Sequence, residues 1–312
     1  MIRGRRAGSG MNIIFIDLEW NGAPLYSTGG YYNEIIEIGA VKVDERLEQI
    51  DTFQSFIRPK VHKRLTGRVK RLTHISNDEV RGAISFLAEL ELFRKWVGPE
   101  ENCFMTWGTT DILVWLEDLE HIGKPQRLES AHYYCDAQEL CRTKLDIDKR
   151  KQPGLSTVAE MIGVGIAEDE MHRAVQDCRI SLECLRKLWD KELFDRLRTP
   201  ADEEFVKKLT FKPVTICDPN NPVVDRSKFA VECPECGGMM EQATEPKPRG
   251  KGFSMKYTCG PCGKEYIVRH MFRIKYEGTE YKRSIKEIIH PPKDEAEGSG
   301  GPAFPGGEDE VQ

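Results

Sequence analysis

The sequence has no long hydrophobic run and no apolar leader. No stretch approaches the roughly 18 apolar residues of a membrane-spanning helix, so neither a membrane span nor a membrane partner is expected. Residues 1–10 lack the apolar core of a secretion signal, and we interpret them as a leader, an upstream start or a cloning remnant ahead of Met11. These absences predict a cytoplasmic protein.

The sequence also lacks a positive net charge. Its formal charge is −5, which excludes a protein that binds nucleic acid by bulk electrostatics alone. The charge is unevenly distributed: residues 196–290 carry 18 Lys and Arg against 13 Asp and Glu, whereas residues 291–312 carry one against six. If the protein binds nucleic acid, metal ions in the acidic N-terminal part and the basic C-terminal part must together offset the electrostatic repulsion.

A short apolar strand is predicted over residues 12–20, and it ends in two carboxylates, Asp17 and Glu19. Side chains alternate along a strand, so these two point to one side, roughly 6–7 Å apart. Two buried like charges at that separation require a cation, and a divalent metal that also binds phosphate oxygens is the simplest one. The alternative is an exposed Asp-x-Glu where the strand leaves the sheet.

The next segments predict a mixed α/β layer fold. Strands are expected over 34–43 and 51–58, after a Gly-rich polar turn over 21–33. Ser76 and Glu79 have capping-box spacing, a helix is expected over 84–97, and a buried strand over 103–107. Residues 133–144 and 155–162 are either two helices or a strand and a helix.

Three further polar residues stand where a ligand site is expected. Asp111 follows the strand over 103–107, where α/β sheets place ligands, or it caps the next helix. His172 precedes an apolar-periodic helix and Asp177 lies one turn inside it, so both can reach one cleft. The alternatives are a surface histidine and a carboxylate on the helix's polar face.

Taken together, Asp17-Leu18-Glu19, Asp111 after Trp107-Gly108, and His172-x4-Asp177 resemble the motifs of the DEDDh branch of DnaQ-like 3′–5′ exonucleases. The resemblance covers residues 12–189 and is nearest the branch that trims small RNA and histone mRNA and includes bacterial sporulation-inhibitor-like relatives. It implies an RNase H-like fold with a five-stranded mixed sheet flanked by helices. His74 stands where the family usually has glycine.

The resemblance implies a two-metal mechanism with Mg²⁺ or Mn²⁺ ions about 3.5–4 Å apart. Asp17 would bridge both ions, Glu19 and Asp177 would hold the ion that binds the attacking water, and Asp111 would hold the other. His172 would accept the proton of that water. The products would be nucleoside 5′-monophosphates released from the 3′ end of single-stranded nucleic acid. The terminal nucleotide would lie against Leu18, Trp20, Thr73 and Ile75, although Trp20 is equally compatible with a core position.

Four of the ten cysteines form two Cys-x-x-Cys pairs, and the second cysteine of each pair precedes glycine. This spacing predicts one structural zinc ion in a zinc ribbon, with all four positions filled by protein. Redox pairs are an alternative that does not explain the matching glycines, and disulfides do not fit a reducing compartment. The other six cysteines are irregularly spaced and are expected to be reduced and packed. The zinc ligands would be Cys233, Cys236, Cys259 and Cys262.

The sequence therefore predicts an exonuclease domain over 11–195, a linker over 196–228, a zinc-ribbon domain over 229–290 and a disordered acidic tail over 291–312. The ribbon could bind a protein partner, or nucleic acid through Lys247, Arg249, Lys251 and Lys256 with Phe253 and Tyr257 interleaved. RNA is slightly favoured as the substrate. The alternatives are a DNA exonuclease for repair or end trimming, and a non-catalytic regulator that binds nucleic acid through the ribbon.

Overall fold

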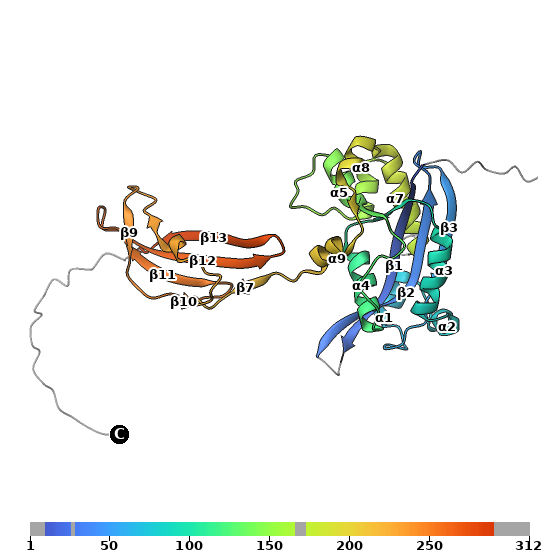
Figure 1. The fold of residues 1–312 in the computed structure, drawn as a ribbon, viewed down its shortest axis with the longest axis horizontal. Coiled ribbons are helices and arrows are strands. Elements are labelled where there is room, and N and C mark those ends of the chain that lie inside the picture. The colour runs from blue at the N-terminus through green and yellow to red at the C-terminus, as the bar shows by residue number, and fades with distance from the viewer. Residues whose placement is uncertain (1–9, 26–28, 166–172, 290–312) are drawn as a thin grey trace, which may run out of the picture. The chain divides into compact units, whose positions relative to one another are not determined.

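The computed structural model describes residues 10–25, 29–165 and 173–289, and it divides the chain into two compact units, Met1–Thr210 and Phe211–Gln312 (Figure 1). The boundary falls inside segment 196–228, which the sequence predicts as a linker. Most of that segment has regular structure: residues up to 210 belong to the first unit, and β7 (Val214–Ile216) pairs within the sheet of the second. None of the described helices is long and apolar enough to cross a membrane.

The first unit is built on one mixed sheet with the strand order β3-β2-β1-β4-β5-β6. β1, β2 and β3 form an antiparallel meander, β4 and β5 run parallel to β1, and the two-residue β6 closes the edge. The predicted mixed sheet flanked by helices is confirmed, with β6 as a short addition to its five main strands. The strands are β1 (Asn12–Leu25), β2 (Gly30–Val43), β3 (Gln49–Phe56), β4 (Asn102–Thr106), β5 (Tyr133–Asp136) and β6 (Thr199–Pro200).

The segment 21–33, predicted as a Gly-rich turn, instead continues both β1 and β2 as far as Leu25 and Gly30. Cross-strand pairing offsets the poor strand propensity of its glycine and asparagine residues. The register shifts by one residue between Glu19 and Trp20. This bulge lies directly after the acidic pair, where it ends the regular alternation of β1.

Alternate residues of β1 enter two separate cores. Ile13 and Phe15 pack with α5, α6, α7 and α8, whereas Ile14 and Ile16 pack with α3 and α4. The sheet is therefore covered on both faces, which explains why β1 is an uninterrupted apolar run. The helices of this unit are α1 (Gly67–Thr73), α2 (Asn77–Gly82), α3 (Phe86–Val97), α4 (Thr110–His121), α5 (Ala137–Lys144), α6 (Leu155–Met161), α7 (Ala174–Leu188), α8 (Lys191–Leu197) and α9 (Glu203–Thr210).

Local sequence signals set several of these boundaries. Ser76 and Glu79 form the predicted capping box at α2. α3 ends at Gly98, whose φ of 79° lies in the left-handed region that glycine adopts without strain. Residues 133–144, expected to form either one helix or one strand, contain both, because β5 and α5 occupy that segment, whereas the helix expected over 155–162 is present as α6.

The second unit is an antiparallel sheet with the order β13-β12-β11-β9-β8, in which β10 pairs with β11 and β7 with β12. Phe253 and Tyr257 of β11 are buried, at 0% and 1% exposure. They therefore cannot stack on nucleic-acid bases beside the lysines, as the sequence suggested. The elements are a 3₁₀ helix η2 (Arg226–Phe229) and β8 (Val231–Glu232), β9 (Met239–Gln242), β10 (Lys247–Pro248), β11 (Phe253–Thr258), β12 (Glu265–Lys275) and β13 (Gly278–Glu287).

Candidate active site and metal centre

The acidic pair of β1 meets the first turn of α7. Asp17 and Glu19 share the strand face of Ile13 and Phe15, which is the face that α7 covers. Asp177 lies in the first turn of α7, one turn inside the helix as predicted. Carboxylate oxygens of Asp17, Glu19 and Asp177 all lie within 4.8 Å of one another. Three carboxylates from two distant segments thus converge on a volume that one cation can fill.

Asp111 lies against the same strand from the sheet's other helix layer. It occupies the first turn of α4, after β4 ends, and only 6% of it is exposed. The residue at the helix N-cap is Thr109, so Asp111 is not the capping residue. Its Oδ1 accepts a hydrogen bond of 3.0 Å from the backbone N–H of Leu18, between the two acids of β1. The structure therefore brings together all four of the acids singled out in the sequence.

Burial and mutual repulsion make the charged cluster unfavourable without a cation. Burial, followed by the charges of Asp111, Asp177 and Glu19, raises the pKa of Asp17 well above its usual range. Burial and the charge of Asp177 raise the pKa of Glu19 to about 9. Burial also raises the pKa of Asp111 to about 7, although the Leu18 N–H favours its charged form. A divalent cation would supply the opposite charge that this donor set lacks.

Gly39 lets α7 approach the sheet closely enough to place Asp177. Gly39 pairs with Asp17 across β1 and β2. A Cβ at Gly39 would lie 2.3 Å from both Ala174 C and Val175 N, in the first turn of α7. Any other residue at this position would push the helix start away from the strand that carries the acids.

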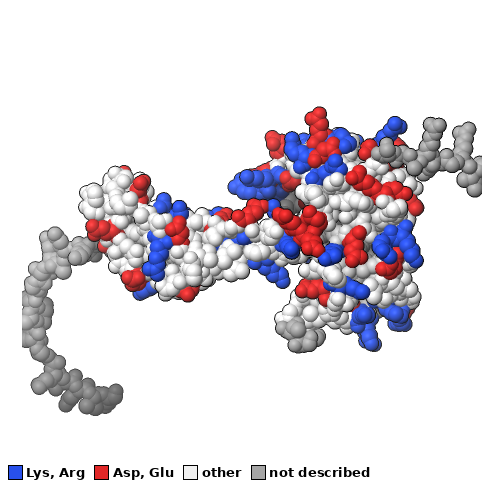
Figure 2. All heavy atoms as spheres, in the orientation of Figure 1, with Lys and Arg blue, Asp and Glu red and all other residues white. Residues whose placement is uncertain are grey.

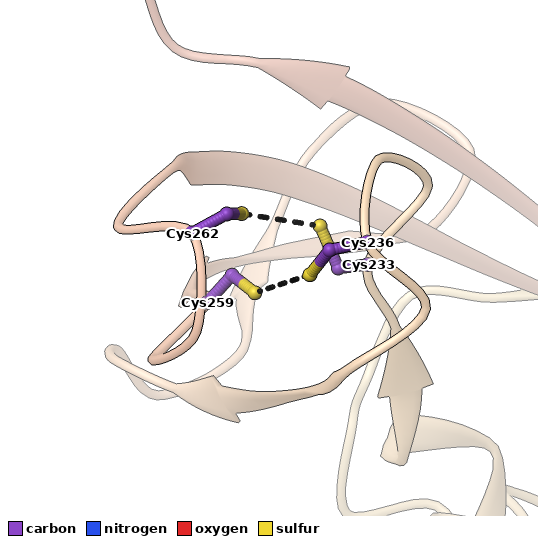
Figure 3. A group of neighbouring side chains, drawn as sticks. All are labelled: Cys233, Cys236, Cys259 and Cys262. Carbon is purple, nitrogen blue, oxygen red and sulfur yellow. Dashed lines mark hydrogen bonds between the residues drawn. The ribbon is translucent and has the colours of Figure 1, made fainter.

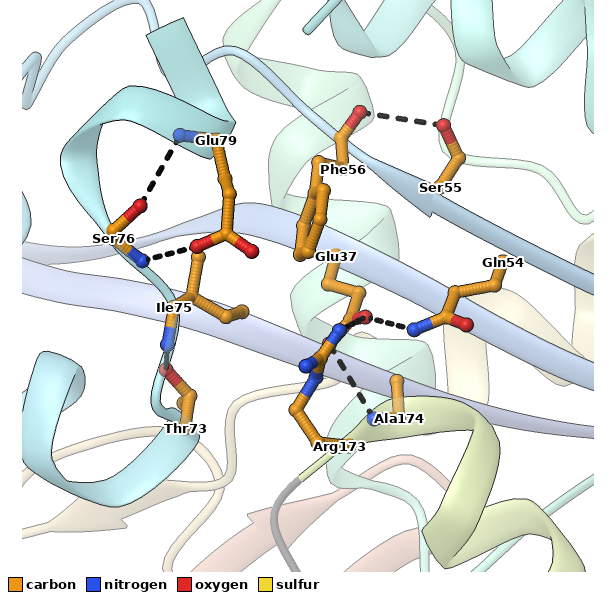
Figure 4. Close-up of polar contacts among 10 residues, drawn as sticks. All are labelled: Glu37, Gln54, Ser55, Phe56, Thr73, Ile75, Ser76, Glu79, Arg173 and Ala174. Carbon is orange, nitrogen blue, oxygen red and sulfur yellow. Dashed lines mark hydrogen bonds and ion pairs between the residues drawn. The ribbon is translucent and has the colours of Figure 1, made fainter.

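A fifth acid, Glu37, ties the start of α7 to the sheet (Figure 4). Glu37 is fully buried and lies opposite Glu19 in the β1–β2 register. Its oxygens accept hydrogen bonds from Gln54 Nε2 at 2.6 Å, Arg173 Nη2 at 3.1 Å and the Ala174 N–H at 3.5 Å. The N-cap residue Arg173 offers no side-chain acceptor, so Glu37 supplies the acceptor that a capping residue usually provides.

The sequence pattern did not assign a role to Glu37. The available signal was a single charged residue within the apolar run of residues 35–38, because a lone carboxylate in a buried strand needs partners. His172, the expected proton acceptor, lies outside the described residues. α7 begins two residues later in the chain, at Ala174, with Arg173 as its N-cap residue.

Three of the four residues expected to contact the terminal nucleotide are buried, namely Leu18, Thr73 and Ile75, at 1–2% exposure. The fourth, Trp20, is half-buried and packs against the core on the α3 and α4 side. Between Thr73 and Ile75, His74 has a φ of 58°, a left-handed conformation that favours glycine. This geometry fits the glycine that is usual there in the resembled family.

The four patterned cysteines converge in the second unit (Figure 3). Their sulfur atoms all lie within 4.8 Å of one another, with Cys233 Sγ 3.6 Å from Cys262 Sγ and Cys236 Sγ 3.4 Å from Cys259 Sγ. Both pairs close the same turn: the N–H of the following glycine donates to the carbonyl of the first cysteine, at 3.0 Å for Gly237 and 2.8 Å for Gly263. Both glycines have a positive φ, which explains why glycine follows the second cysteine of each pair.

This sulfur set fits a tetrahedral metal centre. Cys233 Sγ lies 3.5 Å from the Tyr266 hydroxyl. Burial opposes the charge on Cys233, but the Tyr266 hydroxyl and the N–H groups of Glu235 and Cys236 outweigh it and lower its pKa to about 6. A thiolate is the form that binds zinc, so the turn prepares this sulfur for a metal.

The mixed sheet, its helix layers and the four acids at β1 together define a nuclease of the RNase H-like class. The exonuclease family model RNase_T matches residues 14–185, more than half of the chain. The chain belongs to this family and is a DnaQ-like 3′–5′ exonuclease.

Two curated relatives illustrate the similarity. The probable 3′–5′ exonuclease KapD of Bacillus subtilis is 33% identical over 196 residues, which cover 61% of this chain and 91% of that protein. The PolC-type DNA polymerase III of Staphylococcus saprophyticus is 35% identical over 150 residues, which cover 47% of this chain but 9% of the polymerase. The chain thus spans about a tenth of the PolC relatives that it matches.

Solved structures agree on the fold. The nuclease domain of 3′hExo, a DEDDh family member bound to rAMP, superposes with a TM-score of 0.51 at 20% identity, covering 57% of this chain and 91% of that one. A full-length 3′-exonuclease superposes with a TM-score of 0.52 at 17% identity, covering 62% and 92%.

Proposed function

We propose that the protein removes nucleoside 5′-monophosphates from the 3′ end of single-stranded nucleic acid, with RNA slightly preferred over DNA. The observation that most supports this proposal is the carboxylate cluster of the half-buried Asp17 and the buried Glu19 and Asp177, with oxygens within 4.8 Å of one another. Such a cluster has little structural use on its own, because desolvation and repulsion disfavour its charged form.

The residues fit Mg²⁺ or Mn²⁺, which prefer carboxylate and water oxygens. Asp17, Glu19 and Asp177 would hold one ion, and Asp17 and Asp111 would contribute to a second. Two such ions would supply Lewis-acid stabilisation of the attacking and leaving oxygens of the phosphodiester. The four side chains hold their oxygens in place through β1, α4 and α7, and the Leu18 N–H orients Asp111.

Two further assignments belong to the same proposal. His172 precedes α7 in the chain and would accept the proton of the attacking water near neutral pH. The half-buried Trp20 ring would stack on the base of the terminal nucleotide, whereas Leu18, Thr73 and Ile75, at 1–2% exposure, would pack behind that surface and not touch the nucleotide.

One zinc ion bound by Cys233, Cys236, Cys259 and Cys262 would hold the second unit together, since metal binding energy in such sites is folding energy. The ribbon would then assist substrate or partner binding. A non-catalytic role for the whole chain is disfavoured, because each of the four acids expected for catalysis is present and converges with the others.

Matched RNA and DNA oligomers of one sequence, labelled at either end, test the activity. With Mg²⁺ or Mn²⁺, we expect a 5′-labelled strand to shorten by single nucleotides and a 3′-labelled strand to release one labelled mononucleotide at once. Asp17→Ala should abolish both signals, whereas Asp195→Ala on α8 removes only surface ion pairs and should leave them unchanged. Undiminished activity of Asp17→Ala would reject the metal assignment. The RNA-to-DNA rate ratio decides the preferred sugar.

A further inference from the structure

The sheet of the second unit has one covered face and one open face. Along β12, Tyr266, Val268, His270 and Phe272 are buried at 0–2% exposure. The residues between them, Ile267, Arg269, Met271 and Arg273, are half-buried or exposed. The alternation shows that only one face of β12 is packed against the core of this unit.

The pairing of the strands places several Lys and Arg side chains on the open face of the sheet. Lys256 of β11 and Lys286 of β13 pair with Ile267 from either side. Ser254 pairs with Arg269 and with Lys247 of β10, and Lys282 pairs with Met271. Directly paired residues point to the same side of a sheet. We call the following six side chains the basic face: Lys247, Lys256, Arg269, Arg273, Lys282 and Lys286.

Most of this positive charge is not neutralised within the protein. Glu280 pairs with Arg273 in the register and lies 3.1 Å from Lys282. Among the described residues, Lys247, Lys256 and Lys286 make no ion pair shorter than 4.0 Å. Figure 2 shows a band of Lys and Arg side chains crossing the strands of this unit. The band indicates a surface suited to a polyanion.

Arg269, near the middle of the basic face, adds a second and independent indication. Its Nε is buried and has no hydrogen-bond partner within the described part of the chain. An unsatisfied buried donor on a cation is costly, and an anionic oxygen would satisfy it. Further along β12, a cavity of about 150 Å³ is lined by Lys251, Met271, Arg273, Glu280 and Lys282, among others.

We propose that the basic face binds the phosphate backbone of single-stranded nucleic acid without sequence preference. Phosphates would pair with the six cations, and Arg269 would donate Nε–H to one of them. Ile267 and Met271 alternate with Arg269 and Arg273 along β12, so they offer apolar surface to unpaired bases, which a duplex keeps stacked inside. The inference extends the proposed exonuclease function to a second contact site for the same substrate.

The test measures binding and cleavage separately. Binding of a fluorescent 30-nucleotide single strand is followed by anisotropy against salt concentration, in a zinc-loaded Asp17→Asn background that prevents cleavage. Lys256→Gln/Lys286→Gln removes two phosphate contacts. The slope of log K against log salt should therefore become less steep by about 1.4, at about 0.7 per contact on single strands.

The matched control is Lys228→Gln/Arg283→Gln, which removes two charges from the covered side. Lys228 lies in η2, whose backbone accepts hydrogen bonds from Tyr257 and Tyr281, and Arg283 pairs with the buried His270. This control should keep the slope of the parent. Equal slopes for the basic-face variant and the parent would overturn the proposal.

Cleavage of a dinucleotide, too short to occupy a second site, separates this inference from the proposed function. It should be unchanged in Lys256→Gln/Lys286→Gln with Asp17 intact. If no variant with Asp17 intact cleaves either the labelled oligomers or the dinucleotide but the slope still becomes less steep, the exonuclease proposal fails and the binding proposal stands. If the dinucleotide is cleaved and the slope is unchanged, the binding proposal fails alone.

Discussion

Replacing Gly39 by alanine tests whether close approach of α7 to the sheet positions the active site. The new Cβ would lie 2.3 Å from backbone atoms of Ala174 and Val175, about 1 Å short of the 3.4 Å at which ordinary contact begins. These two atoms belong to one peptide group, and the next atom met is Ala174 Cβ at 2.7 Å, so no flexible side chain can move aside. The start of α7, and Asp177 with it, must shift by about that distance.

Two effects of this shift can be measured. Overpacking costs about 1–3 kcal/mol, which lowers the Tm of a unit this size by about 2–12 °C. A displacement of about 1 Å in a catalytic group can reduce the rate by about 100-fold. We therefore expect Gly39→Ala to remain folded but to lose about two orders of magnitude in kcat on a 5′-labelled oligonucleotide.

The control is Gly82→Ala in α2, where an added Cβ meets no atom within 4 Å. Alanine is favoured over glycine in a helix by about 1 kcal/mol, so this variant should be neutral or slightly more stable and fully active. If Gly39→Ala has the rate and Tm of the parent, α7 tolerates the displacement and the account of how Asp177 is placed is wrong.

Three other predictions concern the metals and the cap of α7. Because the pKa of Glu19 is raised from 4.5 to about 9 and that of Asp111 from 3.8 to about 7 on folding, the metal-free protein should lose stability as the pH rises from about 4 to 9. Mg²⁺ at 100 times its Kd should raise the free energy of unfolding by about 2.7 kcal/mol at pH 8 and by much less at pH 5. The measurement is the Tm with and without Mg²⁺ as a function of pH, and a Tm increase that is the same at every pH would contradict the role of the acidic cluster. Glu37→Ala should lower kcat far more than Glu37→Gln, which keeps an acceptor for the Ala174 N–H; equal losses in the two variants would show that the acceptor does not position α7. Cys233→Ser/Cys236→Ser should reduce bound zinc from about one ion per chain to none, measured by metal analysis, and should unfold residues 211–289, measured by proteolysis. Zinc retained by this double mutant would refute the four-sulfur site.

Sequence alone determined the features that depend on short spacing. Each Cys-x-x-Cys-Gly turn determines the backbone conformation around its two cysteines, because the turn spans only a few residues. The two glycines adopt the positive φ that the turn requires. Strand alternation likewise placed Asp17 and Glu19 on one side of β1, and helix periodicity placed Asp177 one turn inside α7.

Tertiary structure decided what depends on packing between distant segments. Convergence of Asp111 and Asp177 on β1 follows from two helix layers that cover opposite faces of the sheet, and Glu37 gained its role only when α7 packed on Gly39. In the second unit, too, sequence alone could not determine which residues are buried. Alternation in the sequence separates Phe253 and Tyr257 from Lys256 between them, but which set faces the core depends on what covers the sheet. Local spacing fixes which side chains share a face, whereas burial of apolar surface between segments far apart in the chain fixes which face is inside.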